Sequence, residues 1–202
     1  MHKTSTYITL LLTAVFCVGC TAGTGGAATT TGSSKTLSGA QTPASATGEL
    51  KFKVPDGWVP EKPSSNMRVA QYKLAKVEGD SDDAALVLYF FGSAQGGSVS
   101  DNIDRWVNQM QQADGKPSKE KAKIETLTVN GLKVTTVDVS GTYTAQMTPG
   151  SDTKHNDSNQ RLLAAVVETP KGNYFAELIG PEKTVSHWNQ SFTDYIKSAE
   201  FK

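Results

Sequence analysis

The chain has 202 residues with 20 basic and 20 acidic side chains, so its formal net charge is zero. A balanced charge excludes the broad basic surface that nucleic-acid binding needs, and it gives no general attraction to anionic lipid. Both cysteines lie in the stretch CVGC near the N-terminus, where a redox pair, a metal clip and a modification site are the alternatives.

The first predicted element is a secretory signal over residues 1–19. His2 and Lys3 form a basic start, residues 8–18 form an apolar run, and Gly19 is a small residue directly before Cys20. A membrane-spanning helix needs about 20 apolar residues, and a polar, glycine-rich stretch ends this run too early. The segment is therefore expected to be cleaved.

Cleavage before Cys20 removes Cys17, which excludes a redox pair; the further ligands of a zinc site are missing too. The stretch FCVGC, residues 16–20, resembles the lipobox of bacterial lipoproteins, although Cys17 stands where that family prefers leucine. The resemblance implies that the Cys20 thiol carries diacylglycerol and that its amine carries a fatty acid such as palmitate. An ordinary cleaved signal with an incidental cysteine is the alternative.

A lipidated Cys20 implies an exported protein of the cell envelope that is anchored to a membrane without spanning it. Each buried methylene contributes about 0.8 kcal/mol, so two or three acyl chains hold a water-soluble domain on a bilayer. Thr21 follows the cysteine where aspartate would resemble an inner-membrane retention signal. In a bacterium with two membranes, the outer membrane facing the periplasm is therefore favoured.

A linker is predicted over residues 20–48. After Cys20 it consists almost entirely of Thr, Gly, Ala and Ser, with Lys35 its only charge and Leu37 its only large apolar side chain. Such a segment buries too little surface to offset the entropy of ordering it. We expect a flexible tether with a root-mean-square span of about 30 Å.

A globular domain is predicted over residues 49–202, which is long enough for one core. Strands are expected over 49–54 and 67–74, and the apolar run 84–92 predicts a central strand buried on both faces. A helix is expected after Ser98, because Ser98 and Asp101 have capping-box spacing and apolar residues then recur at helical intervals. A second helix is expected near the C-terminus, with Trp188 in its apolar stripe.

Two hairpins complete the predicted sheet. Asn130-Gly131 lies between two β-branched runs, which is a strong signal for a type I′ turn. After it, Leu132 and Val134 set one phase of alternation and Val137 and Val139 the other, which indicates either a bulge or a strand covered on both sides. The second hairpin joins residues 161–169 to 173–180.

These elements predict an α+β domain: a single antiparallel sheet of about six strands covered by helices. Their order, the stretch FKVPDGWVP at 52–60 and the aromatic-bearing last helix resemble the PsbP-like superfamily, over residues 49–202. That superfamily includes a photosystem II extrinsic subunit and a Ran-binding nuclear transport factor. The resemblance implies a layered sandwich and a role in binding or assembling proteins, and it implies no site residue.

The glycine-rich loop 92–98 is the candidate ligand site. Gly96, Gly97 and Ser98 precede a predicted helix N-terminus, where exposed N–H groups could hold an anion. Ser98-Val99 stands where a phosphate-binding loop requires lysine followed by serine or threonine. A strand-to-helix connection without a ligand is the alternative.

Catalytic and metal-binding groups are sparse. His155 and His187 are the histidines of the mature chain; one falls in a polar loop and the other on the outer side of the last helix, which disfavours a catalytic triad. An EF-hand starting at Asp80 would need glycine at its sixth position and glutamate at its twelfth, and both are missing. A loose cation site at Asp80, Asp82 and Asp83 and simple solvation of a turn stay open. The three tryptophans of the domain, Trp58, Trp106 and Trp188, are expected to anchor the core.

Taken together, the sequence favours a lipid-anchored envelope protein that binds or helps to assemble an envelope component, without catalysis. The predicted partners are the membrane, through the anchor, and an envelope protein; no cofactor, metal or nucleic acid is implied. The alternative is a small-ligand carrier or an enzyme whose site lies in the loop 92–98.

Overall fold

The computed structural model describes residues 49–202. The predicted signal peptide 1–19, Cys20 and the linker 20–48 lie outside the described residues and stay predictions. Within residues 49–202, neither helix combines the length and the hydropathy that crossing a membrane requires.

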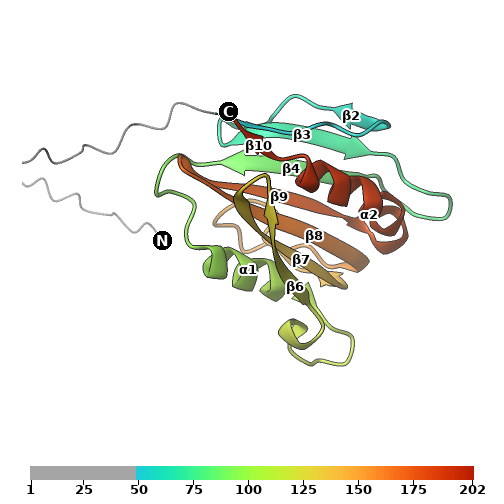
Figure 1. Cartoon of the computed structure of the whole chain (residues 1–202). Coiled ribbons are helices and arrows are strands. Elements are labelled where there is room, and N and C mark those ends of the chain that lie inside the picture. Colours follow the sequence, from blue (N-terminus) through green and yellow to red (C-terminus); the bar gives the residue numbers. More distant parts are fainter. Residues whose placement is uncertain (1–48) are drawn as a thin grey trace, which may run out of the picture. The chain divides into compact units, whose positions relative to one another are not determined.

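Most of the domain is one antiparallel sheet of eight strands (Figure 1). The spatial order is β2-β3-β4-β9-β8-β7, and the free edge of β7 pairs with both β6 and β5. The strands are β2 (Trp58–Pro60), β3 (Arg68–Leu74), β4 (Ala84–Phe90), β5 (Met110–Gln111), β6 (Lys123–Val129), β7 (Leu132–Tyr143), β8 (Asp157–Thr169) and β9 (Gly172–Pro181). A separate two-stranded sheet joins β1 (Leu50–Lys51) to β10 (Glu200–Phe201). The helices are α1 (Val99–Asn108) and α2 (Glu182–Lys197), and a 3-10 turn, η1, covers Ser118–Glu120.

The sheet is covered on both faces, which gives the domain two apolar cores. Along β8, Leu163, Ala165 and Val167 belong to the core under α2, whereas the alternate residues Leu162, Ala164 and Val166 belong to the core under α1. Successive strand residues point to opposite faces, so the two helices lie on opposite sides of the sheet. The α+β layered class predicted from the sequence is therefore confirmed.

Several predicted elements are confirmed. Asn130 and Gly131 both have positive φ angles and form the two-residue turn between β6 and β7. The change of phase along β7 reflects a strand covered on both sides, because Val134 lies in one core and Val137 in the other. The capping box is also present, since the Asp101 N–H donates to the Ser98 hydroxyl at 3.1 Å. The strand β4 lies inside the sheet, as predicted.

The sheet has more strands than the predicted six. The additional strands, β2 and β5, have three and two residues, which is too short for alternation to be visible in the sequence. The strand expected over 49–54 is wrong in extent, because only Leu50 and Lys51 pair, and they pair with β10 instead of the main sheet. After them, Phe52 leaves the strand and stacks on Tyr195 of α2, with ring centroids 4.4 Å apart.

Candidate functional site

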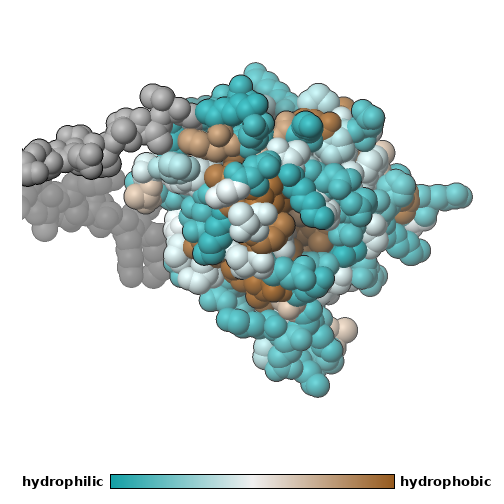
Figure 2. All heavy atoms as spheres, in the orientation of Figure 1, coloured by the Kyte–Doolittle hydropathy of each residue, from teal (hydrophilic) through white to brown (hydrophobic). Residues whose placement is uncertain are grey.

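A cavity of about 270 Å³ lies between β6 and α2, over β7 and β8. We call it the β6–α2 groove. Figure 2 shows hydrophobic surface in the middle of this face, framed by hydrophilic residues. The lining residues are Lys123, Glu125 and Leu127 of β6, Thr136, Val137 and Asp138 of β7, Leu163 of β8, and Asn189, Phe192, Thr193, Ile196 and Lys197 of α2.

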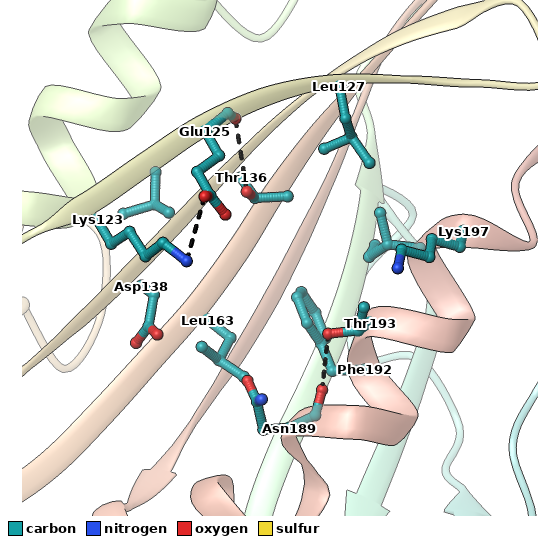
Figure 3. A pocket seen from close by; sticks show the side chains of 12 residues that line it. Lys123, Glu125, Leu127, Thr136, Asp138, Leu163, Asn189, Phe192, Thr193 and Lys197 are labelled. Carbon is teal, nitrogen blue, oxygen red and sulfur yellow. Dashed lines mark hydrogen bonds and ion pairs between the residues drawn. The ribbon is translucent and has the colours of Figure 1, made fainter.

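The periodicities of the two walls explain why these side chains meet. On β6, Lys123, Glu125 and Leu127 recur at every second residue and therefore share one face of the strand. On α2, the lining positions follow helical spacing, so Asn189 and Thr193 lie above one another on one side of the helix. Figure 3 shows the β6 and α2 side chains reaching into the same space from two sides.

The floor of the groove is apolar. Leu163, Phe192 and Ile196 are buried members of the core under α2, and Leu127 packs partly buried against them. These side chains are held in place by the core itself, so the floor is formed before any ligand arrives. A preformed apolar floor with a few polar groups around it is typical of small-ligand sites.

The rim carries charged groups that balance. Lys123 pairs with Glu125 of the same strand at 3.1 Å, and Asp138 receives two hydrogen bonds from the Arg161 guanidinium at 2.9 and 2.7 Å. Among the ion pairs of residues 49–202, none includes Lys197, which is exposed at the end of α2. The two lysines and two carboxylates of the lining sum to a formal charge of zero, but Arg161 occupies Asp138, so Lys197 is the lining cation that no carboxylate of the described residues pairs with.

A second, more open hollow of about 440 Å³ shares Lys123 and Asp138 with the groove. It is polar: Arg161 also donates to the Ser186 hydroxyl at 2.9 Å, and the Ser140 hydroxyl donates to Glu182 at 2.9 Å. The hydrogen bonds to Asp138 raise the pKa of Arg161 above its ordinary value. The apolar groove therefore opens at one end onto a polar surface.

The hydroxyl groups of the groove are already engaged. Thr193 donates to the backbone oxygen of Asn189 at 3.0 Å, and Thr136 donates to the backbone oxygen of Glu125 at 3.5 Å. A nucleophilic hydroxyl needs a neighbouring base, and both of these donate to backbone carbonyls instead. The lining therefore favours binding over covalent chemistry.

The predicted loop site lies elsewhere in the domain, and Gly96, Gly97 and Ser98 do not line the groove. Gly96 has a positive φ of 85°, and a Cβ atom there would approach Phe175 and Phe91 to 2.7 Å. The Asn102 side chain donates to the Gly96 carbonyl at 2.8 Å, and the helix start is occupied by the capping box. The loop thus has structural reasons for its glycines, and its ligand-binding role stays a prediction.

The acidic cluster forms part of the turn between β3 and β4, as expected, but Asp80 does more than solvate it. Its carboxylate accepts hydrogen bonds from the backbone N–H and the hydroxyl of Thr184, at 2.9 and 2.6 Å, and so caps α2 from a distant loop. Asp83 instead accepts from the backbone N–H of Lys76. Within residues 49–202, no group of three or more His, Cys, Asp or Glu side chains is arranged to hold a metal ion.

The histidines and tryptophans lie where the sequence analysis expects them. His155 contacts Asp157 at 2.8 Å in the loop before β8, and His187 is exposed on α2. Trp58 and Trp106 are buried, and Trp188 packs against the core under α2.

Solved structures match the chain, LpqN, PA94 and CyanoP among them, whereas no protein-family model and no curated protein matches it. LpqN of Mycobacterium tuberculosis, a protein involved in cell envelope biogenesis, covers 80% of this chain and 87% of its own length, at 9% identity and a TM-score of 0.51. PA94 of Pseudomonas aeruginosa covers 74% and 94% at 11% identity, and CyanoP, the PsbP of Synechocystis, covers 82% and 99% at 12% identity; both have TM-scores of 0.42.

At 9% identity, the similarity to LpqN shows the fold alone. The TM-scores of PA94 and CyanoP are below 0.5, so neither structure carries an argument about this chain. No residue of a site is carried over from any of these structures.

The sequence analysis missed the β6–α2 groove. Alternation along residues 123–127 is visible in the sequence, but it indicates only that these side chains share a face. The opposing wall comes from α2, more than sixty residues later, and no local pattern joins the two.

Proposed function

We propose that the chain is a lipid-anchored protein of the cell envelope whose domain binds another envelope component in the β6–α2 groove, without catalysing a reaction. The observation that carries the proposal is the groove itself: a cavity of about 270 Å³ with a buried apolar floor and a charge-balanced polar rim. The lipobox-like stretch that ends at Cys20 supports the location.

The comparison with LpqN adds support of a general kind. LpqN is involved in cell envelope biogenesis, and its fold resembles this domain over most of both chains. Proteins that share one fold carry out many functions. The role of LpqN therefore supports only the proposed location in the cell envelope, and it does not identify a ligand.

Crosslinking tests the groove directly. A photoreactive amino acid at Asn189, which lines the groove, is compared with the same amino acid at Gln190, the next residue of α2, which is exposed and outside the lining. In intact cells, we expect a defined adduct from position 189 and none from position 190. Adducts from both positions, or from neither, would contradict a role of the groove.

The anchor is tested separately. Mass spectrometry of the membrane fraction should find the mature chain beginning at a Cys20 that carries diacylglycerol, and Cys20→Ser should release the protein from the membrane. A soluble chain that begins at another residue would contradict the anchor while leaving the crosslinking result in place.

A further inference from the structure

A patch of exposed apolar side chains lies at the end of the domain where the described chain begins. Large hydrophobic side chains exposed in residues 49–202 are Val54, Val59, Met67, Val69, Phe91, Ile124 and Met147. Three of them, Val54, Met67 and Val69, lie at this end, and we call them the N-terminal patch. Phe91 packs on the other face of the sheet, against Tyr89 and Phe175 of the core under α1.

The connections within the N-terminal patch follow from the structure. Val54 and Val69 line one shallow hollow of about 190 Å³, and Glu49, the first described residue, lines it too. Met67 lies two residues before Val69, and its carbonyl accepts a hydrogen bond from the backbone N–H of Phe90 at the end of β4. Figure 1 shows the start of β3, the end of β4 and the C-terminus at this same end of the sheet.

The patch has aromatic groups behind it, which hold it rigid. Phe52, Tyr72, Tyr174 and Tyr195 form the inner wall of the hollow. Phe52 stacks on Tyr195, and Phe90 stacks on Tyr174, each with ring centroids 4.4 Å apart. A rigid apolar patch loses little entropy when it is covered.

We propose that the N-terminal patch docks the domain on the lipid surface that holds its own anchor. This inference rests on the proposed lipidation of Cys20. The chain between Cys20 and Glu49 enters the domain beside the patch, and its predicted span of about 30 Å keeps the patch close to the bilayer. Tethering by a short linker gives an effective concentration in the millimolar range, so a patch with a dissociation constant of only about 1 mM is docked for much of the time.

The occupant is a lipid surface because the aliphatic side chains of the patch, with aromatic groups behind them, lie near exposed lysines. Lys51 and Lys53 flank Phe52, which lines the hollow, and both lysines are exposed. Lysine side chains keep their charge in the headgroup region while neighbouring apolar groups enter the acyl boundary. A partner protein at this end is the competing outcome of the test.

The experiment uses a matched pair of methionines. Met67 is 52% exposed in the patch, and Met147 is 55% exposed in the loop before β8. The start of β8 pairs with the end of β9, and the end of β9 pairs with the start of β4, so Met147 lies at the opposite end of the sheet. The two positions therefore lie at opposite ends of the sheet and have nearly the same exposed fraction.

Met67→Cys and Met147→Cys are each labelled with an environment-sensitive fluorophore in the lipidated mature chain, in which acylation blocks the thiol of Cys20. The chains are reconstituted in vesicles of phosphatidylcholine and phosphatidylglycerol that contain a nitroxide-labelled lipid. We expect the label at position 67 to be quenched at least about twofold more than the label at position 147, and Val69→Ser to reduce that difference. An unchanged circular dichroism spectrum shows that each variant is folded.

Equal quenching at both positions of vesicle-bound protein overturns the docking, and so does quenching at neither. The lipidation is distinguished by the unsubstituted chain, whose only cysteine after cleavage is Cys20. If that thiol takes up the label and the protein stays outside the vesicles, the proposed anchor fails and the docking fails with it. The proposal is also overturned if a copurified protein, and not lipid, covers the label at position 67.

Discussion

Asp80 is expected to contribute strongly to stability although it lies in an otherwise solvated loop. The helix α2 begins after Pro181, which offers no side-chain cap. The Asp80 carboxylate replaces that cap by accepting hydrogen bonds from the backbone N–H and the hydroxyl of Thr184. Thr184 has an exposed fraction of 0%. Asp80→Ala therefore removes one capping bond and one charge-assisted bond, and it leaves two buried donors without a partner.

The expected cost follows from these two bonds. Loss of a helix cap costs about 1 kcal/mol, and loss of a hydrogen bond to a charged group costs about 1.5–3 kcal/mol. Because such losses overlap, we expect the free energy of unfolding of Asp80→Ala to fall by about 2–3 kcal/mol. For a domain of this length, that lowers the Tm by about 5–10 °C.

Urea unfolding of the mature chain, followed by circular dichroism, measures the effect. Asp82→Ala is the matched control, because the Asp82 carboxylate accepts only from the hydroxyl of the adjacent Ser81. It should change the stability by less than about 0.5 kcal/mol. If Asp80→Ala is as stable as Asp82→Ala, the capping of α2 by this loop is not a source of stability and the reasoning fails.

Two further predictions concern packing and pH. In urea unfolding, Gly96→Ala should lower the free energy of unfolding by about 2 kcal/mol more than Gly79→Ala does. Both glycines have positive φ, but only at Gly96 would a Cβ atom meet Phe175. Equal losses would contradict the packing role of Gly96. Burial, assisted by the nearby Glu177 carboxylate, raises the pKa of Tyr143 from 10.0 to about 12. The folded chain therefore holds this proton longer than the unfolded chain, so the stability that Tyr143 contributes is fully present below about pH 10 and is lost between about pH 10 and pH 12. Tyr143→Phe should reduce the loss of stability over this pH range, and an unchanged loss would refute the assignment.

The elements that could be predicted from the sequence are those with a local cause. Asn130-Gly131 forms a turn because two adjacent residues must have positive φ, and Ser98 with Asp101 starts α1 because their side chains bond the first free N–H groups. The alternation along β7 even implied a covering on both faces as one of two alternatives. Each of these signals lies within a few residues of the element that it specifies.

The elements that could not be predicted depend on distant partners. Leu50 and Lys51 look like the start of a strand in the main sheet, but they pair with Glu200 and Phe201 near the end of the chain. Asp80 looks like a turn residue, and only the approach of Thr184, more than a hundred positions later, makes it a cap. In both cases the sequence shows the group that can bond, and not the group that it meets.

By itself, the sequence determined the longer strands, the two helices and the α+β class, because hydrophobic periodicity and turn chemistry act over a few neighbouring residues. Only the tertiary structure decided where a ligand could bind. The β6–α2 groove forms because α2 packs over β8 and β9 and leaves β6 standing apart from it, with Leu163 and Phe192 as floor. That arrangement depends on the packing of whole elements against one another, which no local stretch of the chain encodes.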